Sequence, residues 1–116
     1  MVKINGIELE DIDFLEADTA EKIEKAIDET LEVAKKSQSL TSLPKVIRTQ
    51  CTAVFDCFNT IWGEGTDTKI FGDKVNLKIC LNAFEELLSI LNIQKENAEK
   101  EFSKYSPNRV QRRNKK

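Results

Sequence analysis

The chain of 116 residues contains no histidine, and this absence excludes more chemistry than any other feature of its composition. Histidine is the commonest general base and metal ligand near neutral pH, so Ser-His and Cys-His nucleophile pairs and His-ligated metal sites are excluded. Carboxylates are abundant, but none has both the apolar surroundings and the second catalytic group that acid–base catalysis needs. We interpret Asp56, which lies in a predicted helix between Phe55 and Cys57, as a surface acid. The sequence predicts a non-enzymatic protein without cofactor or metal.

Cysteine is scarce, and the few cysteines lack the spacing of a metal site. The chain has three of them, Cys51, Cys57 and Cys80, each among apolar residues. An odd number without a CxxC pair argues against a zinc site and against a disulfide framework. We expect reduced, buried thiols that behave as small apolar side chains. Cys57 lies off the main apolar face of its predicted helix, so it should be the most reactive of the three.

Long hydrophobic runs are also missing. No apolar run approaches the ~20 residues that are needed to span a bilayer. The first six residues, MVKING, do not form a signal peptide. We therefore expect no membrane contact and a protein that stays in the cytoplasm where it is made.

Charge is unevenly distributed along the chain. Of 18 basic and 20 acidic residues, five bases and no acid lie in residues 105–116, so residues 1–104 hold 13 bases against 20 acids. Eleven of these acids lie in residues 8–32, and we favour a solvated helix face over an acidic partner-binding surface for them. The basic segment suits an acidic protein surface, including that of a neighbouring copy, or a solubilising end. Nucleic acid is an unlikely partner, because the rest of the chain is acidic and only Tyr105 could stack on a base.

The N-terminal residues predict a β-hairpin. Asn5-Gly6 favours a type I′ turn, which requires positive φ at both central residues. Such a turn places Ile4 opposite Ile7 and Val2 opposite Leu9. The alternation that continues through Ile12 and Phe14 predicts a third short strand or an extended continuation.

Residues 1–104 as a whole predict a single, mainly α-helical domain. Its expected elements are a β-hairpin or strands in 1–15, helices at 19–36 and 45–62, a short helix or turn at 66–72, and a long helix at 76–104. A flexible basic tail, 105–116, follows. Asp18 and Glu21 resemble a capping box, Pro44 suits a first helical turn, and Thr66 and Gly72 should cap and end the short helix.

Apolar residues at spacings of three and four predict the buried faces of the helices. The first helix has a narrow apolar stripe, Ile23, Ile27, Leu31 and Ala34. The second has the richest stripe and should form the centre of the core, with Ile47, Cys51, Val54, Phe55, Phe58, Ile61 and Trp62. The third long helix has Leu77, Cys80, Leu81, Phe84, Leu87, Leu88 and Leu91.

The last helix should be longer than the body that it packs against. Residues 76–104 contain neither glycine nor proline. A helix of that length would span about 44 Å, against a diameter of roughly 35 Å for a compact domain of this size. We favour an overhang over a break near Asn92. The apolar stripe thins beyond Leu91, and an overhang with few internal contacts predicts a binding surface for another protein. The predicted partner contacts are Leu91, Phe102, Tyr105, Arg109, Arg112 and Arg113.

Three segments, 4–26 (INGIELEDIDFLEADTAEKIEKA), 58–87 (FNTIWGEGTDTKIFGDKVNLKICLNAFEEL) and 105–113 (YSPNRVQRR), resemble small tail-module proteins of phages and prophages of Gram-positive bacteria. That family is regarded as tail assembly chaperones or chaperone-like proteins. The resemblance implies a non-enzymatic protein of the infected or lysogenic host cytoplasm. It would bind the tape measure protein, the tail tube protein or both, with self-association left open. The rival function is binding to a host defence protein, either by acidic mimicry or as the trigger that is sensed.

Overall fold

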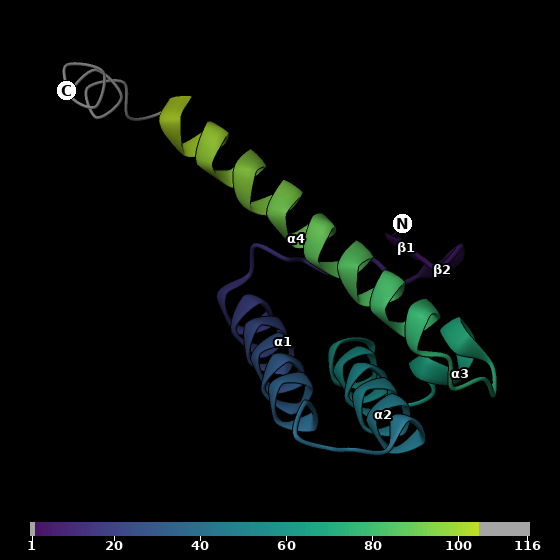
Figure 1. The fold of residues 1–116 in the computed structure, drawn as a ribbon. Helices are drawn as coiled ribbons and strands as arrows, with labels where there is room; N and C mark the ends of the chain where they lie inside the picture. The colour runs from purple at the N-terminus through teal and green to yellow at the C-terminus, as the bar shows by residue number, and fades with distance from the viewer. Residues whose placement is uncertain (1, 105–116) are drawn as a thin grey trace.

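The protein is mainly α-helical with a short N-terminal hairpin, as the sequence predicts (Figure 1). The structure is a computed structural model and describes residues 2–104; the predicted basic tail, 105–116, lies outside the described residues. The elements are β1 (Val2–Ile4), β2 (Ile7–Leu9), α1 (Ala17–Ser37), α2 (Leu43–Trp62), α3 (Thr66–Phe71) and α4 (Leu77–Lys104).

The β-hairpin has the predicted turn and the predicted register. Asn5 and Gly6 have φ values of 53° and 76°, and Val2 pairs with Leu9 while Ile4 pairs with Ile7. The Asn5 side-chain amide donates to the Ile70 carbonyl oxygen at 3.1 Å, and the Asn5 backbone N–H donates to the Glu86 carboxylate at 3.0 Å. The turn residue therefore fastens the hairpin to the helical body.

The third strand that Ile12 and Phe14 suggested is not formed. The Leu15 N–H donates to the Asp13 carboxylate at 3.1 Å and the Glu16 N–H donates to the Asp13 carbonyl at 3.2 Å, so a turn replaces strand pairing. Phe14 is instead buried against the helices. The segment between the hairpin and α1 therefore ends in a turn, with Phe14 packed into the core.

Helix α1 begins earlier than predicted and has a different cap. The Glu16 carboxylate, not Asp18, accepts from the Thr19 N–H and hydroxyl, both at 2.9 Å. These two hydrogen bonds lower the pKa of Glu16. Asp18 lies in the first turn, where its negative charge is stabilised by the positive end of the helix dipole.

The buried face of α1 is rotated from the predicted stripe. Leu31 is 49% exposed, while Ala26 and Thr30 are buried beside Ile23 and Ile27. Helix α1 packs mainly against α2, so only one narrow face of α1 is buried. Leu31 directly follows the buried Thr30 and lies just outside that face.

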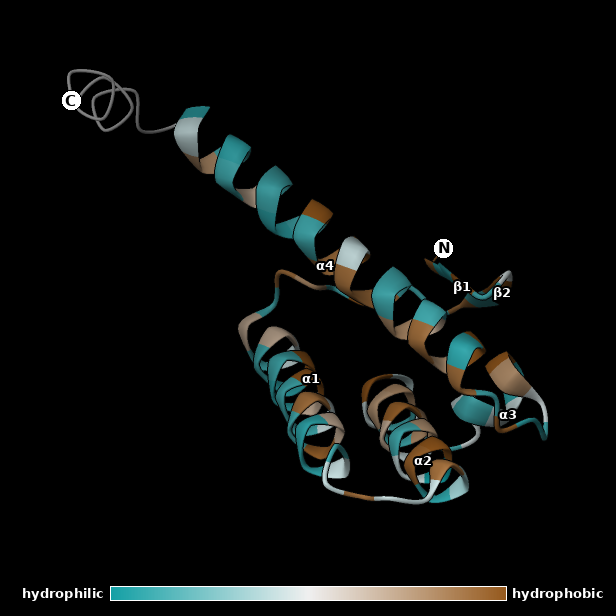
Figure 2. Ribbon diagram, in the orientation of Figure 1, coloured by the Kyte–Doolittle hydropathy of each residue, from teal (hydrophilic) through white to brown (hydrophobic). Residues whose placement is uncertain are grey.

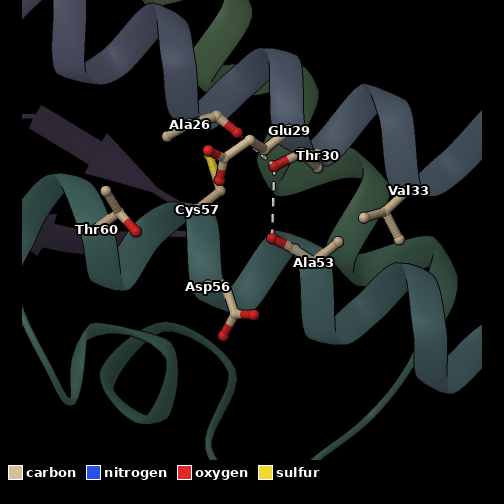
Figure 3. A pocket seen from close by; sticks show the side chains of 8 residues that line it. All are labelled: Ala26, Glu29, Thr30, Val33, Ala53, Asp56, Cys57 and Thr60. Atoms are coloured by element: carbon tan, nitrogen blue, oxygen red, sulfur yellow. Dashed lines mark hydrogen bonds between the residues drawn. The ribbon is translucent and has the colours of Figure 1, made fainter.

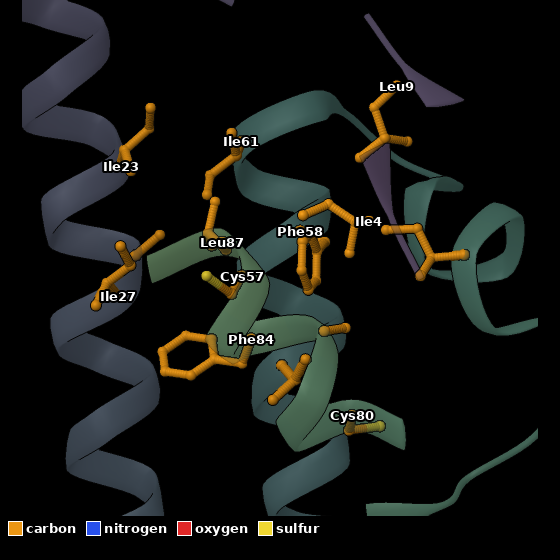
Figure 4. Packing of buried hydrophobic residues seen from close by; sticks show 14 of the residues in the cluster. Ile4, Leu9, Ile23, Ile27, Cys57, Phe58, Ile61, Cys80, Phe84 and Leu87 are labelled. Carbon is orange, nitrogen blue, oxygen red and sulfur yellow. The ribbon is translucent and has the colours of Figure 1, made fainter. Parts of the chain in front are cut away.

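Helix α2 is the centre of the core, as predicted. It packs against α1, α3 and α4, and the Phe58 side chain is fully buried among residues from the other elements (Figure 4). The Phe58 ring lies 5.9 Å from Trp62 and 5.9 Å from Phe71, centroid to centroid. The Trp62 indole N–H donates to the Glu10 carbonyl oxygen at 2.9 Å, which holds the segment after the hairpin against this cluster.

That Cys57 is the most reactive of the three thiols stays a prediction, because Cys57 is 2% exposed while Cys51 and Cys80 are fully buried. All three cysteines are free and buried. Cys57 does lie off the stripe that contains Phe58, but α2 has neighbours on more than one side. The flank that holds Cys57 faces α1 and is covered by it.

Two glycines with positive φ bound the short helix α3. Gly72 ends it with φ 66°, as predicted, and Gly65 precedes it with φ 90°. Thr66 is the first helical residue, not the cap, and its hydroxyl donates to the Gly63 carbonyl oxygen at 2.6 Å. The Asp67 N–H donates to the Asn59 side chain at 2.9 Å and ties α3 to α2.

Helix α4 is continuous through Asn92, as predicted. Its 28 residues span about 42 Å, and the longest dimension of the molecule is 55 Å. Cys80, Ala83, Phe84 and Leu87 are buried in its first half, whereas Leu81 is 44% exposed, contrary to prediction. Figure 2 shows a mostly hydrophilic second half that extends beyond the body.

We expect Phe58→Ala to lower the free energy of unfolding by about 3–5 kcal/mol, because it removes a fully buried ring and leaves a cavity. Leu81→Ala on the exposed side of α4 should cost less than about 1 kcal/mol. Urea unfolding followed by circular dichroism measures both. Equal losses in the two variants would contradict the packing described here.

Candidate functional site

The candidate site is a groove where the N-terminal half of α1 faces the middle of α4. Helix α4 passes the N-terminal end of α1 and then continues past the body (Figure 1). The groove encloses about 330 Å³. Its lining comes from the turn before α1, from α1 and from α4: Phe14, Leu15, Ala20, Ile23, Glu24, Ile27, Leu91, Gln94, Lys95 and Ala98.

Most of this lining is apolar, and the charges lie on opposite sides of it. Glu24 lies on α1 and Lys95 on α4, and both side chains are exposed. Leu15 is 61% exposed at the groove. An open apolar channel with a few charges at its rim suits an amphipathic helix better than a small polar ligand.

The stripe on α4 that lines the groove continues beyond it. Leu91, Ala98 and Phe102 follow one another at intervals of seven and four residues, so they lie on one helical face. Leu91 and Ala98 are half-buried, and Phe102 is 50% exposed. Ile93 is 55% exposed but points to another side of the helix, because it does not share this spacing.

Two of the six predicted partner-binding residues lie on this stripe. Phe102 is exposed on the overhang, as expected. Leu91 is not on the overhang, because it packs partly against the hydrophobic core and forms one wall of the groove. The other four, Tyr105, Arg109, Arg112 and Arg113, lie outside the described residues.

The opposite wall of the groove was missed from the sequence. Phe14 and Leu15 belong to a segment that resembled a strand, and Ala20 is exposed and too small to mark an apolar stripe. Their role comes from the crossing of α1 and α4, which no local spacing encodes. The only sequence signal for this wall was the apolar pair Phe14-Leu15, which lies shortly before the first helix.

A second, smaller crevice lies between α1 and α2, with a volume of about 90 Å³ (Figure 3). Such a space has room for a few water molecules. The Thr30 hydroxyl donates to the Ala26 carbonyl at 2.8 Å, and Ala53 accepts from it at 3.4 Å. Asp56 is exposed and points away from the Cys57 side chain, which agrees with its interpretation as a surface acid.

The thiols of Cys57 and Cys80 are poor nucleophiles. Burial raises the pKa of Cys57, and the carboxylate of Glu29 raises it further. Burial, together with the neighbouring Cys51, raises the pKa of Cys80 to about 12. Because the thiolate is the reactive species, these side chains remain inert near neutral pH.

Among residues 2–104, no group of three or more His, Cys, Asp or Glu side chains is placed to hold a metal ion. No helix in that range combines the length and apolar character needed to cross a membrane.

The outer face of α1 is strongly acidic. Its exposed carboxylates include Asp18, Glu21, Glu24, Asp28 and Glu32. Lys22 and Lys25 are exposed among them, so the face is mixed in sign but has an excess of acids. Solvation of this face agrees with the favoured interpretation of the acidic run.

The described residues thus form a small, mainly α-helical protein with an open, largely apolar groove beside an overhanging helix. A family model matches residues 5–116, and the chain belongs to that family, a family of unknown function (DUF6673). No curated protein and no solved structure matches the chain.

The raised thiol pKa values predict a loss of stability at alkaline pH. Above pH 9.0, the ordinary thiol pKa, an unfolded chain releases the Cys80 proton, whereas the folded chain keeps it up to a pKa of about 12. The unfolded state is therefore favoured increasingly as pH rises through this window. Urea midpoints measured from pH 8 to about pH 10 should fall, and they should fall less steeply for Cys80→Ala. Identical slopes for the two proteins would contradict the buried, protonated thiol.

Proposed function

We propose that this protein is a non-enzymatic, chaperone-like component of a phage tail module in Gram-positive hosts. It binds the tape measure protein, the tail tube protein or both in the cytoplasm of the infected or lysogenic cell. The resemblance of three chain segments to such proteins motivates the client. The observation that supports a binding role is the apolar groove beside the overhang of α4.

The groove has the form that an amphipathic helix requires. Its α4 wall runs from Leu91 to Ala98 and is extended by Phe102, so the stripe covers about 16 Å, or three helical turns. A client helix with apolar residues at i, i+3 or i+4, and i+7 could place them along this length. A tape measure protein, as a very long helical chain with apolar stripes, offers many such segments.

A site of this size favours weak binding by each copy. Three turns of helix in an open groove bury less surface than a stable protein interface of about 1,200–2,000 Å² in total. Many copies along one long client would nevertheless cover it, and any contact between neighbouring copies would add avidity. Weak individual sites also allow tail tube subunits to displace the chaperone as they polymerise.

The host-defence alternative is motivated by the acidic outer face of α1. Its exposed carboxylates could occupy a basic channel of a defence protein by resembling phosphate charge. That binding mode depends on charge and should weaken steeply with added salt. Helix docking in the apolar groove should persist, so a salt titration of any isolated complex distinguishes the two functions.

Substitution in the groove should weaken client binding without unfolding the protein. We expect Phe102→Ala and Leu15→Ser each to raise the dissociation constant for a tape measure segment about tenfold. Leu15 lines the groove, Phe102 lies on the α4 stripe that continues from it, and both side chains are at least half exposed in the free protein. Binding is measured by fluorescence anisotropy with a labelled segment at low protein concentration.

Ile93→Ala is the matched control, since it removes an equally exposed apolar side chain from another side of α4. It should leave binding unchanged. The proposed function fails if all three variants bind the segment as the unmodified protein does. It also fails if Ile93→Ala weakens binding as much as the groove variants.

A further inference from the structure

The second half of α4 is self-complementary about Ala98. Ala98 is the smallest side chain on the stripe that lines the groove, and it is half-buried. Lys95 lies three residues before it and Glu101 three residues after it, so both flank Ala98 on the same side of the helix. Both charged side chains are exposed.

We propose that a second copy of this chain occupies the groove, in a two-fold dimer whose α4 helices cross antiparallel at Ala98. Around such an axis, the residue n positions before Ala98 lies opposite the residue n positions after it in the other copy. Lys95 then lies across from Glu101, and this pair occurs twice. Opposite charges therefore meet on both sides of the crossing, and no like charges are placed directly opposite each other.

The apolar side chains are complementary in the same arrangement. A small residue at the crossing point lets two helices approach closely. Phe102 of one copy lies opposite Gln94 of the other, so its ring enters the groove between Leu15 and Leu91. The groove of about 330 Å³ has ample room, since an apolar cavity of about 150 Å³ accommodates a benzene ring.

The charge of the chain beyond α4 favours a second copy over an unrelated apolar helix. Residues 105–116 carry five bases and no acid. The outer face of α1 presents Asp18, Glu21 and Glu24, so a second copy offers these bases an acidic surface that an uncharged apolar helix lacks.

This inference does not require the client of the proposed function. The dimer uses the same groove, so it would be the resting form of the protein and would compete with a client helix. The two ideas are therefore tested separately: the dimer on the protein alone, and client binding at concentrations where the protein is monomeric.

Charge exchange provides the decisive test. Sedimentation velocity of the full chain alone should show a monomer–dimer equilibrium at micromolar concentration that weakens with salt. Lys95→Glu and Glu101→Lys should each raise the dimer dissociation constant about tenfold, because each creates two like-charge pairs. An equimolar mixture of the two variants should recover dimers, since one variant then presents acids at 95 and 101 and the other presents bases.

A second pair of variants tests the apolar contact. Phe102→Ala should raise the dissociation constant about a hundredfold, because the two-fold axis applies the loss twice. Ile93→Ala, away from the stripe, should leave it unchanged. Circular dichroism checks that each variant remains folded, and these two substitutions still decide the matter if a charge variant does not fold.

Several results would overturn the dimer. They are a protein that stays monomeric up to millimolar concentration, a dimer that is indifferent to Phe102→Ala, or a mixture of folded charge variants that does not recover association. Tape measure binding by Lys95→Glu would in those cases leave the proposed function standing. Conversely, dimers that form as described with no affinity for any tape measure segment would remove the proposed function alone.

Discussion

The length of α4 relative to the core is the constraint on which the rest of the structure depends. The helix has one set of buried contacts, from Cys80 to Leu87, where it packs against α2 and the hairpin. No glycine or proline interrupts the residues that follow, so the backbone continues as a helix although the body ends. A helix that extends past its core must either expose its remaining apolar side chains or find a partner for them. Ala98 is half-buried and Phe102 is 50% exposed, so the stripe stays partly open to solvent beyond the N-terminal end of α1.

Local signals in the sequence were sufficient where one residue type decides the backbone. Asn5-Gly6 determines the hairpin turn and its register, Gly72 ends α3, and the aromatic stripe of α2 identifies the centre of the core. The overhang of α4 followed from its uninterrupted length. In each case the deciding interactions lie within a few residues, or within one helix with an unusually rich apolar face.

The features that the sequence did not predict depend on how many other helices or strands pack against a given helix. The spacing of apolar residues along the chain does not reveal this number. Leu31 and Leu81 fit apolar stripes but lie just outside narrow contact faces. Cys57 lies off the stripe of α2 and is buried because α1 covers a second face. The groove itself joins Leu15 and Ala20 to residues more than seventy positions later in the chain. Only the crossing of two helices places them together, so Leu91 was assigned to a free surface that it only partly occupies.

The central claim is that residues 92–104 are helical yet stand outside the cooperative core. Backbone chemical shifts and native-state amide hydrogen exchange of dilute, monomeric protein test both parts in one NMR experiment. The account predicts helical Cα shifts through residue 104, near-global protection of amides around Leu87, and much weaker protection beyond Ala98. Shifts that turn to coil near Asn92, or distal amides protected as strongly as those of Leu87, would contradict it.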